Sequence, residues 1–155
     1  MTDIVAVGAS HVVSMLALAQ ESRLFDADGM IQIKESLNAY IEGNEELWFM
    51  AWDEKPLGVL YCIPEMMTEG TWNILMLIVI EDAQGKGCGR SLMHHAETVL
   101  KEQDVRLLIV ETSSLDGFEV ARAFYPKCGY TEEARIRNFY TKGDDKIIFT
   151  KSIDG

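Results

Sequence analysis

An apolar segment that runs into a glycine-rich stretch is the feature that most constrains the fold of this chain. Residues Thr71–Ile80 are almost entirely apolar and predict a buried strand. From Ser91 onward, apolar residues recur with helical spacing. The first backbone N–H groups of a helix lack partners within it and carry partial positive charge, so a glycine turn between strand and helix is suited to bind phosphate. The stretch between them consists of Gln84, Gly85, Lys86, Gly87, Cys88, Gly89 and Arg90.

Two common phosphate-binding motifs do not fit the spacing of this stretch. A P-loop needs Gly-Lys-Ser/Thr after a first glycine and four further residues, and Lys86 is followed by the wrong residues. A Rossmann fingerprint needs Gly-x-Gly-x-x-Gly, and its third glycine is missing whether the count starts at Gly85 or at Gly87. What remains is Gln-x-x-Gly-x-Gly, filled by Gln84, Gly87 and Gly89.

That pattern resembles the pyrophosphate loop of the GNAT family of N-acetyltransferases, which bind acetyl-coenzyme A (acetyl-CoA). A second segment strengthens the resemblance, because Arg122–Tyr130 looks like a later helix of the family that carries a tyrosine four residues before a glycine and an aromatic. In this chain these residues are Tyr125, Gly129 and Tyr130. The resemblance covers nearly the whole chain and is densest from Trp72 to Ser152.

Hydrophobic periodicity predicts the other elements, and their order matches that family. The order is one strand, two helices, three strands, a helix, a strand, a helix and two strands, which predicts a mixed α/β sheet with helices on both faces. The resemblance implies a mostly antiparallel sheet of the acyl-CoA N-acyltransferase fold. The expected strands are 4–7, 47–52, 57–63, 71–80, 105–112, 130–140 and 146–152, and the expected helices follow residue 10, span about 30–40, begin at 91 and span about 116–128.

Composition narrows the classes of protein to which the chain can belong. Its 155 residues show no linker or repeat, so we expect a single domain over residues 1–155. A net charge of −11 argues against nucleic-acid binding. The longest apolar run, Ile74–Ile80, is far shorter than the roughly 20 residues that cross a bilayer, so we expect no membrane insertion. Three widely spaced cysteines favour a reducing cytoplasm, and no spacing of Cys and His predicts a metal site.

The resemblance implies the activity and its co-substrate. Members of the family let an amine attack the thioester of bound acetyl-CoA directly, so no nucleophile of the protein and no metal is expected. The acceptor would be the primary amine of a small molecule or of a peptide. A non-catalytic acyl-CoA-binding sensor or regulatory protein is the alternative, and the fold is also compatible with a homodimer.

Residues for binding acetyl-CoA follow from the match to the family. The backbone of Gln84–Ser91 would hold the pyrophosphate, with Lys86 and Arg90 either as cations for it or as solvated charges at the start of a helix. Upstream, the backbone of Leu77 and Val79 would hold the pantetheine arm, and their side chains would belong to the core.

Tyr125 matches the tyrosine that donates a proton to the departing sulfur in the family. The stripe of Phe118, Ala121, Tyr125 and Cys128 predicts that it faces the sheet, where a phenol usually needs a hydrogen-bond partner. The alternative is an aromatic side chain that only packs. Because Pro126 follows it, we expect the helix to kink at Tyr125.

Glu111 is the candidate base, because it lies at the end of an apolar strand on the same face as Leu107 and Ile109. A partly buried carboxylate there can accept the proton that the amine loses. Two alternatives stay open, an ion pair of Glu111 with Arg122 or Arg135 and a chain of water molecules without a single base. The pair Asp144 and Asp145 is expected to serve only the last turn.

Overall fold

The computed structural model describes residues 2–154, which form two compact units. The first unit comprises the described residues up to Ile63 together with Met76–Thr98. The second comprises Pro64–Leu75 and the described residues from Val99 onward. A single domain over the whole chain stays a prediction.

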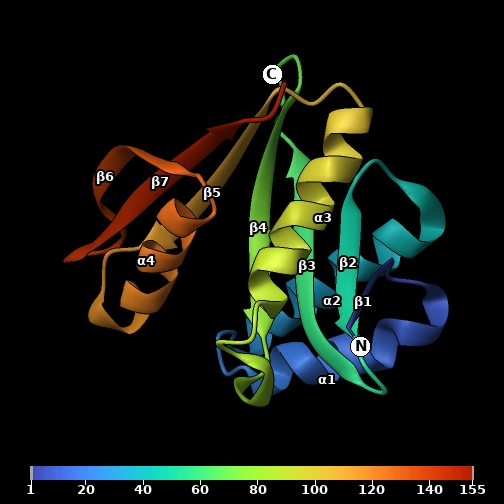
Figure 1. Ribbon diagram of the computed structural model, residues 1–155. Helices are drawn as coiled ribbons and strands as arrows, with labels where there is room; N and C mark the ends of the chain where they lie inside the picture. Colours follow the sequence, from blue (N-terminus) through green and yellow to red (C-terminus); the bar gives the residue numbers. More distant parts are fainter. Residues whose placement is uncertain (1, 155) are drawn as a thin grey trace. The chain divides into compact units, whose positions relative to one another are not determined.

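Within residues 2–154 the strands form one seven-stranded sheet in the order β1-β2-β3-β4-β5-β7-β6 (Figure 1). The β4–β5 pair is parallel, and the pairs β1–β2, β2–β3, β5–β7 and β6–β7 are antiparallel. The predicted mixed, mostly antiparallel α/β sheet is therefore confirmed. The strands are β1 (Asp3–Ala6), β2 (Leu47–Trp52), β3 (Pro56–Pro64), β4 (Thr71–Val79), β5 (Leu107–Ser113), β6 (Thr131–Thr141) and β7 (Asp144–Ser152), and the helices are α1 (Val12–Glu21), α2 (Ala27–Gly43), α3 (Cys88–Glu102) and α4 (Glu119–Lys127), with short 3-10 turns η1 (Ala9–His11), η2 (Glu81–Ala83) and η3 (Asp116–Phe118).

In the first unit, helices cover both faces of the strands (Figure 1). Side chains of a strand alternate between its faces. On one face, Trp48 and Met50 of β2 join a buried cluster with Met15 of α1 and Leu37 of α2. On the other face, the ring of Phe49 lies 5.0 Å from that of His95 in α3. The expected arrangement of helices on both faces is confirmed within this unit.

In the second unit, α4 packs on one face of β5 and β7. The ring of Tyr125 in α4 lies 5.6 Å from that of Phe149 in β7. Phe149 pairs with Val110 of β5, and the next pair along is Glu111 with Ile148. Because paired residues share a face and neighbouring pairs alternate, Glu111 lies on the face opposite α4.

Several helices begin earlier than the periodicity predicts. The α2 helix begins at Ala27 rather than near residue 30, because the side chain of Asp26 caps it by accepting from the N–H of Gly29 at 2.7 Å. The α3 helix begins at Cys88, inside the glycine-rich stretch, rather than at Ser91. None of the helices within residues 2–154 is long and apolar enough to cross a membrane.

Candidate active site

The glycine-rich stretch forms a turn that only glycine adopts without strain. Gly85 and Gly87 have φ angles of 75° and 85°, in the left-handed region that L-residues with a side chain disfavour. A Cβ atom at either position would meet no atom within 4 Å, so the space above the turn is open. The side-chain amide of Gln84 donates to the carbonyl oxygen of Val79 at 2.9 Å and ties the turn to the end of β4. The predicted strand, glycine turn and helix are thus all present.

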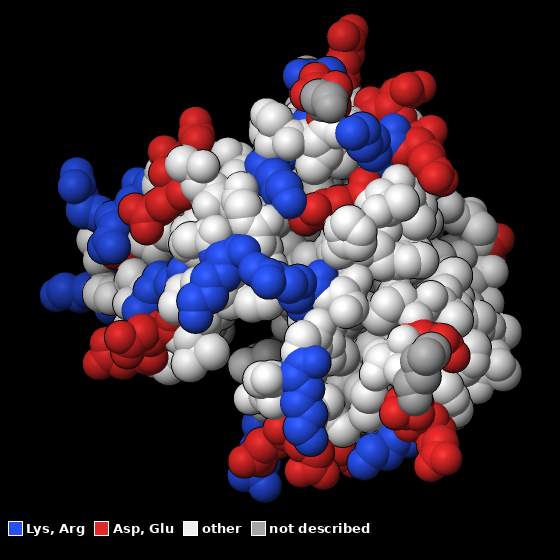
Figure 2. Space-filling view, viewed as in Figure 1, with Lys and Arg blue, Asp and Glu red and all other residues white. Residues whose placement is uncertain are grey.

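A hollow of about 420 Å³ borders this turn in the first unit. Lys86, Gly87 and Ser91 line it from the turn and the first residues of α3, and Lys55 lines it from the segment between β2 and β3. Lys86 and Arg90 are both exposed. Although the net charge is −11, Figure 2 shows groups of Lys and Arg side chains next to groups of Asp and Glu on the face in view. The hollow itself is lined by Asp53 and Asp82 as well as by Lys55 and Lys86.

The cysteine in the turn is a packing residue in this structure. The side chain of Cys88 is buried, and a Cβ atom at Gly58 of β3 would lie 3.3 Å from its sulfur. Burial raises the pKa of the Cys88 thiol, and it raises the pKa of the buried Cys62 thiol to about 12. Both thiols are therefore protonated near neutral pH and are weak nucleophiles.

The expectation that Leu77 and Val79 contribute core side chains is wrong. Because β4 alternates, Met76 and Ile78 point into the cluster shared with α1 and α2, and they are 8% and 6% exposed. Leu77 and Val79 point the other way and are only half-buried. The role expected for their backbone stays a prediction.

Tyr125 lies in α4 with its ring enclosed by other aromatic rings. It is 7% exposed, and its ring centroid lies 5.4 Å from Phe124 and 6.2 Å from Tyr130. Burial raises its pKa to about 12. Within residues 2–154 its hydroxyl makes no hydrogen bond, so this donor is available to a ligand. The α4 helix continues through Pro126 and ends at Lys127, and the kink expected at Tyr125 stays a prediction.

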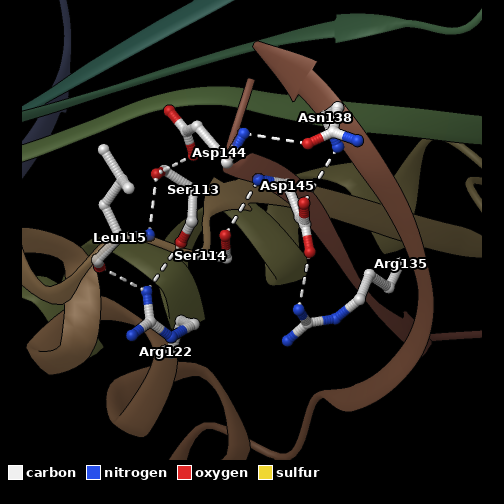
Figure 3. A network of polar contacts seen from close by, with 9 residues as sticks. Ser113, Ser114, Leu115, Arg122, Arg135, Asn138, Asp144 and Asp145 are labelled. Carbon is white, nitrogen blue, oxygen red and sulfur yellow. Dashed lines mark hydrogen bonds and ion pairs between the residues drawn. The ribbon is translucent and has the colours of Figure 1, made fainter. Parts of the chain in front are cut away.

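Polar contacts fasten the start of α4 to the β6–β7 hairpin (Figure 3). Arg122 donates to the carbonyl oxygens of Ser113 and Leu115 at 2.7 and 2.8 Å. The hydroxyl of Ser113 donates to the carboxylate of Asp144, and the backbone N–H of Asp145 donates to the hydroxyl of Ser114 at 2.8 Å. Asp144 and Asp145 therefore do more than form the turn, since they connect the hairpin to the end of β5.

Asp145 offers a test of this network by pH. Its carboxylate accepts from the N–H of Asn138 at 2.9 Å and from Arg135 at 2.7 Å, and these contacts lower its pKa below the ordinary value of 3.8. Because the pKa of Asp145 is lower in the folded state than in the unfolded chain, its ionised carboxylate stabilises the folded state at pH values above the ordinary pKa. This stabilisation is lost as the pH falls through the folded-state pKa. Asp145→Asn should therefore lower Tm at pH 7, and the difference from the wild type should shrink in acid.

Thermal unfolding between pH 2 and pH 7 measures this difference, with the exposed Asp154→Asn as a control. A Tm difference for Asp145→Asn that stays constant over this range would show that the charge of Asp145 does not stabilise the hairpin.

Glu111 forms an ion pair, but with neither of the expected arginines. Its carboxylate lies 2.7 Å from the ammonium of Lys146 in β7 and accepts from the amide of Asn73 at 3.1 Å. Arg122 and Arg135 are instead bound to the groups of the hairpin network. Lys146 and Asn73 were missed in the sequence, although a polar residue inside the apolar segment Thr71–Ile80 was a visible signal.

The predicted site residues are divided between the two units, and Leu77 and Val79 of β4 belong to the first. Gln84–Ser91 lie together in the first unit, at the turn and the start of α3. Tyr125 and Glu111 lie in the second unit, on opposite faces of the β5–β7 pair. The roles predicted for these residues in binding and catalysis remain predictions.

Comparison with known proteins places this arrangement in a family. The profile of the Acetyltransferase (GNAT) family matches residues 14–130. A GNAT-family protein from Desulfovibrio desulfuricans is similar in structure, with a TM-score of 0.92, 23% identity and 99% of each chain covered. The ribosomal-protein-S18-alanine N-acetyltransferase of Escherichia coli gives a TM-score of 0.81 at 20% identity over 100% of this chain and 96% of that one.

An aminoglycoside 6'-N-acetyltransferase complexed with coenzyme A gives a TM-score of 0.80 at 15% identity, with 97% of each chain covered. At the level of sequence, no curated protein matches the chain. The family profile covers well over half of the residues and includes the glycine turn, α3 and Tyr125. The chain therefore belongs to the GNAT family of acetyltransferases.

Proposed function

We propose that this enzyme transfers the acetyl group of acetyl-CoA to the primary amine of a small molecule or a peptide. The observation that carries the proposal is the open glycine turn at the start of α3, with Gly85 and Gly87 at positive φ. Two structurally similar proteins support an amine acceptor, since one is named for alanine and the other for the 6' position of an aminoglycoside.

The residues of the turn suit the pyrophosphate of coenzyme A. The first backbone N–H groups of a helix such as α3 lack partners within it and attract an anion, and the open space over Gly85 and Gly87 would let the pyrophosphate approach the backbone. Lys86 and Arg90 add positive charge at the same place. The backbone of Leu77 and Val79 would hold the pantetheine arm. When bound, acetyl-CoA supplies the acetyl group as an activated thioester.

In the proposed mechanism, two residues of the second unit move protons. As the amine nitrogen bonds to the carbonyl carbon and the carbon–sulfur bond breaks, the hydroxyl of Tyr125 donates its proton to the sulfur. With a pKa of about 12, this phenol keeps its proton throughout the neutral range. Glu111 takes the proton that the amine loses, directly or through water.

The carboxylate of Glu111 is held by two neighbours. The ammonium of Lys146 lies 2.7 Å from it, and the side-chain amide of Asn73 donates to it at 3.1 Å. The side chain is 26% exposed, so solvent reaches it. Its proton could then be passed to water after each turnover.

A thermal-shift titration tests the binding step. A ligand that binds only the folded state at about 100 times its Kd adds about 2.7 kcal/mol of stability, which for a chain of this size raises Tm by about 5 to 10 °C. We expect acetyl-CoA to cause a shift of this order and free adenine nucleotides a smaller one. The absence of any shift at millimolar acetyl-CoA would contradict the proposal. A shift without acetyl transfer to any amine would favour the acyl-CoA-binding sensor.

We also propose that the protein acts in the cytoplasm. Within residues 2–154, Cys62, Cys88 and Cys128 form no disulfide. Free cysteines persist most readily in a reducing compartment.

A further inference from the structure

The ammonium of Lys146 lies in a cage of aromatic rings and a carboxylate. It is 3.6 Å from the ring centroid of Phe139, 6.0 Å from that of Tyr140 and 2.7 Å from the carboxylate of Glu111. The side chain of Lys146 is only 13% exposed. Rings and a carboxylate arranged in this way bind alkylammonium ions, because the ring face and the carboxylate both attract a cation. The cage therefore already holds the kind of group that it recognises.

A buried amide next to the cage lacks a partner for its oxygen. Asn73 is 4% exposed, and its side-chain nitrogen donates to Glu111 and, at 3.0 Å, to Glu65. Within residues 2–154 the side-chain oxygen of Asn73 is buried and accepts no hydrogen bond. An unsatisfied buried acceptor is costly, and native structures contain few of them. The amide of Asn73 joins the carboxylates of Glu65 and Glu111. Its oxygen can therefore accept a hydrogen bond from a ligand that enters beside these carboxylates.

Negative charge around the cage exceeds the positive charge of Lys146. The carboxylates of Glu111 and Asp144 both act on Tyr140, whose pKa is raised first by burial and then by these two charges. Glu65 adds a third carboxylate through Asn73. The ammonium of Lys146 faces Glu111 directly, and two further cations of the hairpin, Arg135 and Arg137, act on Asp145.

The walls of the cage are held in place and open to solvent. Phe139 and Tyr140 are 49% and 46% exposed. They belong to a bulge of β6, where the pairing with β7 shifts between Ile136 and Thr141. The carboxylate of Asp145 fixes this bulge by accepting from the N–H of Asn138 at 2.9 Å. A ligand can thus reach the rings without a rearrangement of the hairpin.

We propose that this cage binds the protonated amine of the acceptor, and that Lys146 is a resident cation which the acceptor displaces. The inference rests on the proposed function and names its acceptor class, a primary alkylamine that carries a positive charge at neutral pH. Displacement of Lys146 brings the acceptor ammonium to Glu111, the proposed base, which takes one proton so that the neutral amine can attack the thioester; the proton that the nitrogen loses as the amide forms passes to water. A neutral molecule of the same shape does not replace the ammonium, because its attraction to the rings and the carboxylate is far weaker.

Titration of the free protein with n-butylammonium, followed by two-dimensional NMR, tests the cage without acetyl-CoA. Lys146→Met removes the resident cation and keeps most of the side-chain volume. Lys151→Met makes the same change in the same strand, at a residue whose ammonium contacts the carbonyl oxygen of Cys128 at 2.9 Å and lies 5.6 Å from the ring centroid of the buried Tyr130. We expect Lys146→Met to bind n-butylammonium roughly tenfold more tightly than the wild type. Lys151→Met should bind it like the wild type, and neutral 1-butanol should not compete.

A second variant keeps the test informative if Lys146→Met unfolds. Phe139→Leu removes an exposed ring, and it should weaken n-butylammonium binding severalfold in the otherwise wild-type protein. Equal binding by wild type, Lys146→Met and Phe139→Leu would overturn the proposal, and so would equal binding of 1-butanol and n-butylammonium. Because acetyl-CoA is absent, failure of the proposed acetyl transfer would leave these results unchanged and would be seen separately in an assay of thiol release and amine acetylation.

Discussion

Replacement of Tyr125 by phenylalanine is expected to lower kcat by about 100- to 10,000-fold, the range typical of a lost general acid. The substitution removes only the hydroxyl, and the ring contacts with Phe124, Tyr130 and Phe149 can persist. Without this donor, the sulfur must leave as an unprotonated thiolate. The initial rate of free-thiol release at saturating acetyl-CoA and amine measures the effect, and the KM for acetyl-CoA should change little.

A matched control is available in the same aromatic cluster. Tyr130 is buried at 3% exposure beside Tyr125, so Tyr130→Phe makes the same chemical change in similar surroundings. It should reduce kcat by less than about threefold. Equal losses in the two variants would assign Tyr125 a packing role. Because the pKa of Tyr125 is about 12, its ionisation should also cause no loss of wild-type activity below about pH 10.

Gly87→Ala is expected to weaken acetyl-CoA binding by about 10- to 100-fold. A left-handed conformation costs a residue with a side chain about 1–2 kcal/mol, and Gly87 has a φ of 85°. The added methyl group would also occupy the open space through which an anion approaches the turn. Isothermal titration calorimetry with acetyl-CoA measures the change in Kd, where each 1.4 kcal/mol is about tenfold.

Gly143 separates the two contributions. It has a φ of 87° in the turn between β6 and β7, and a Cβ atom there would also meet nothing within 4 Å. Gly143→Ala therefore carries a similar backbone cost at a place remote in sequence from the glycine turn. It should lower Tm as much as Gly87→Ala and leave the Kd for acetyl-CoA unchanged. If Gly87→Ala bound acetyl-CoA like the wild type, the turn would not be the pyrophosphate site.

The turn was predictable because its geometry is local. Glycine is required at positions 85 and 87 because the backbone there has a positive φ, and the spacing of the apolar residues predicts β4 on one side of the turn and α3 on the other. The buried position of Tyr125 was predictable for the same reason, since one helical stripe aims it at the sheet. The two faces of β4 could not be predicted, because an uninterrupted apolar run does not show which side chains point to which face. It therefore did not reveal that Leu77 and Val79 face away from the cluster shared with α1 and α2.

The surroundings of Glu111 depend on strands that are distant in sequence. Lys146 reaches Glu111 because β7 lies beside β5 in the register that pairs Ser113 with Lys146 and Glu111 with Ile148. A shift of one residue would move Lys146 to the other face. The sequence contains several cations that could have been the partner, and nothing local shows that Arg135 is instead bound to Asp145. Long-range register, rather than residue type, decides this part of the site.

The most direct test of the central claim is transfer of an isotopically labelled acetyl group. The protein would be incubated with labelled acetyl-CoA and a panel of primary amines, and mass spectrometry would follow the label together with the release of free thiol. We expect an alkylamine to acquire the label in one-to-one proportion to the thiol released. Tyr125→Phe should suppress both the labelling of the amine and the release of thiol. Release of thiol without a labelled amine, or no release in the presence of saturating acetyl-CoA, would contradict it.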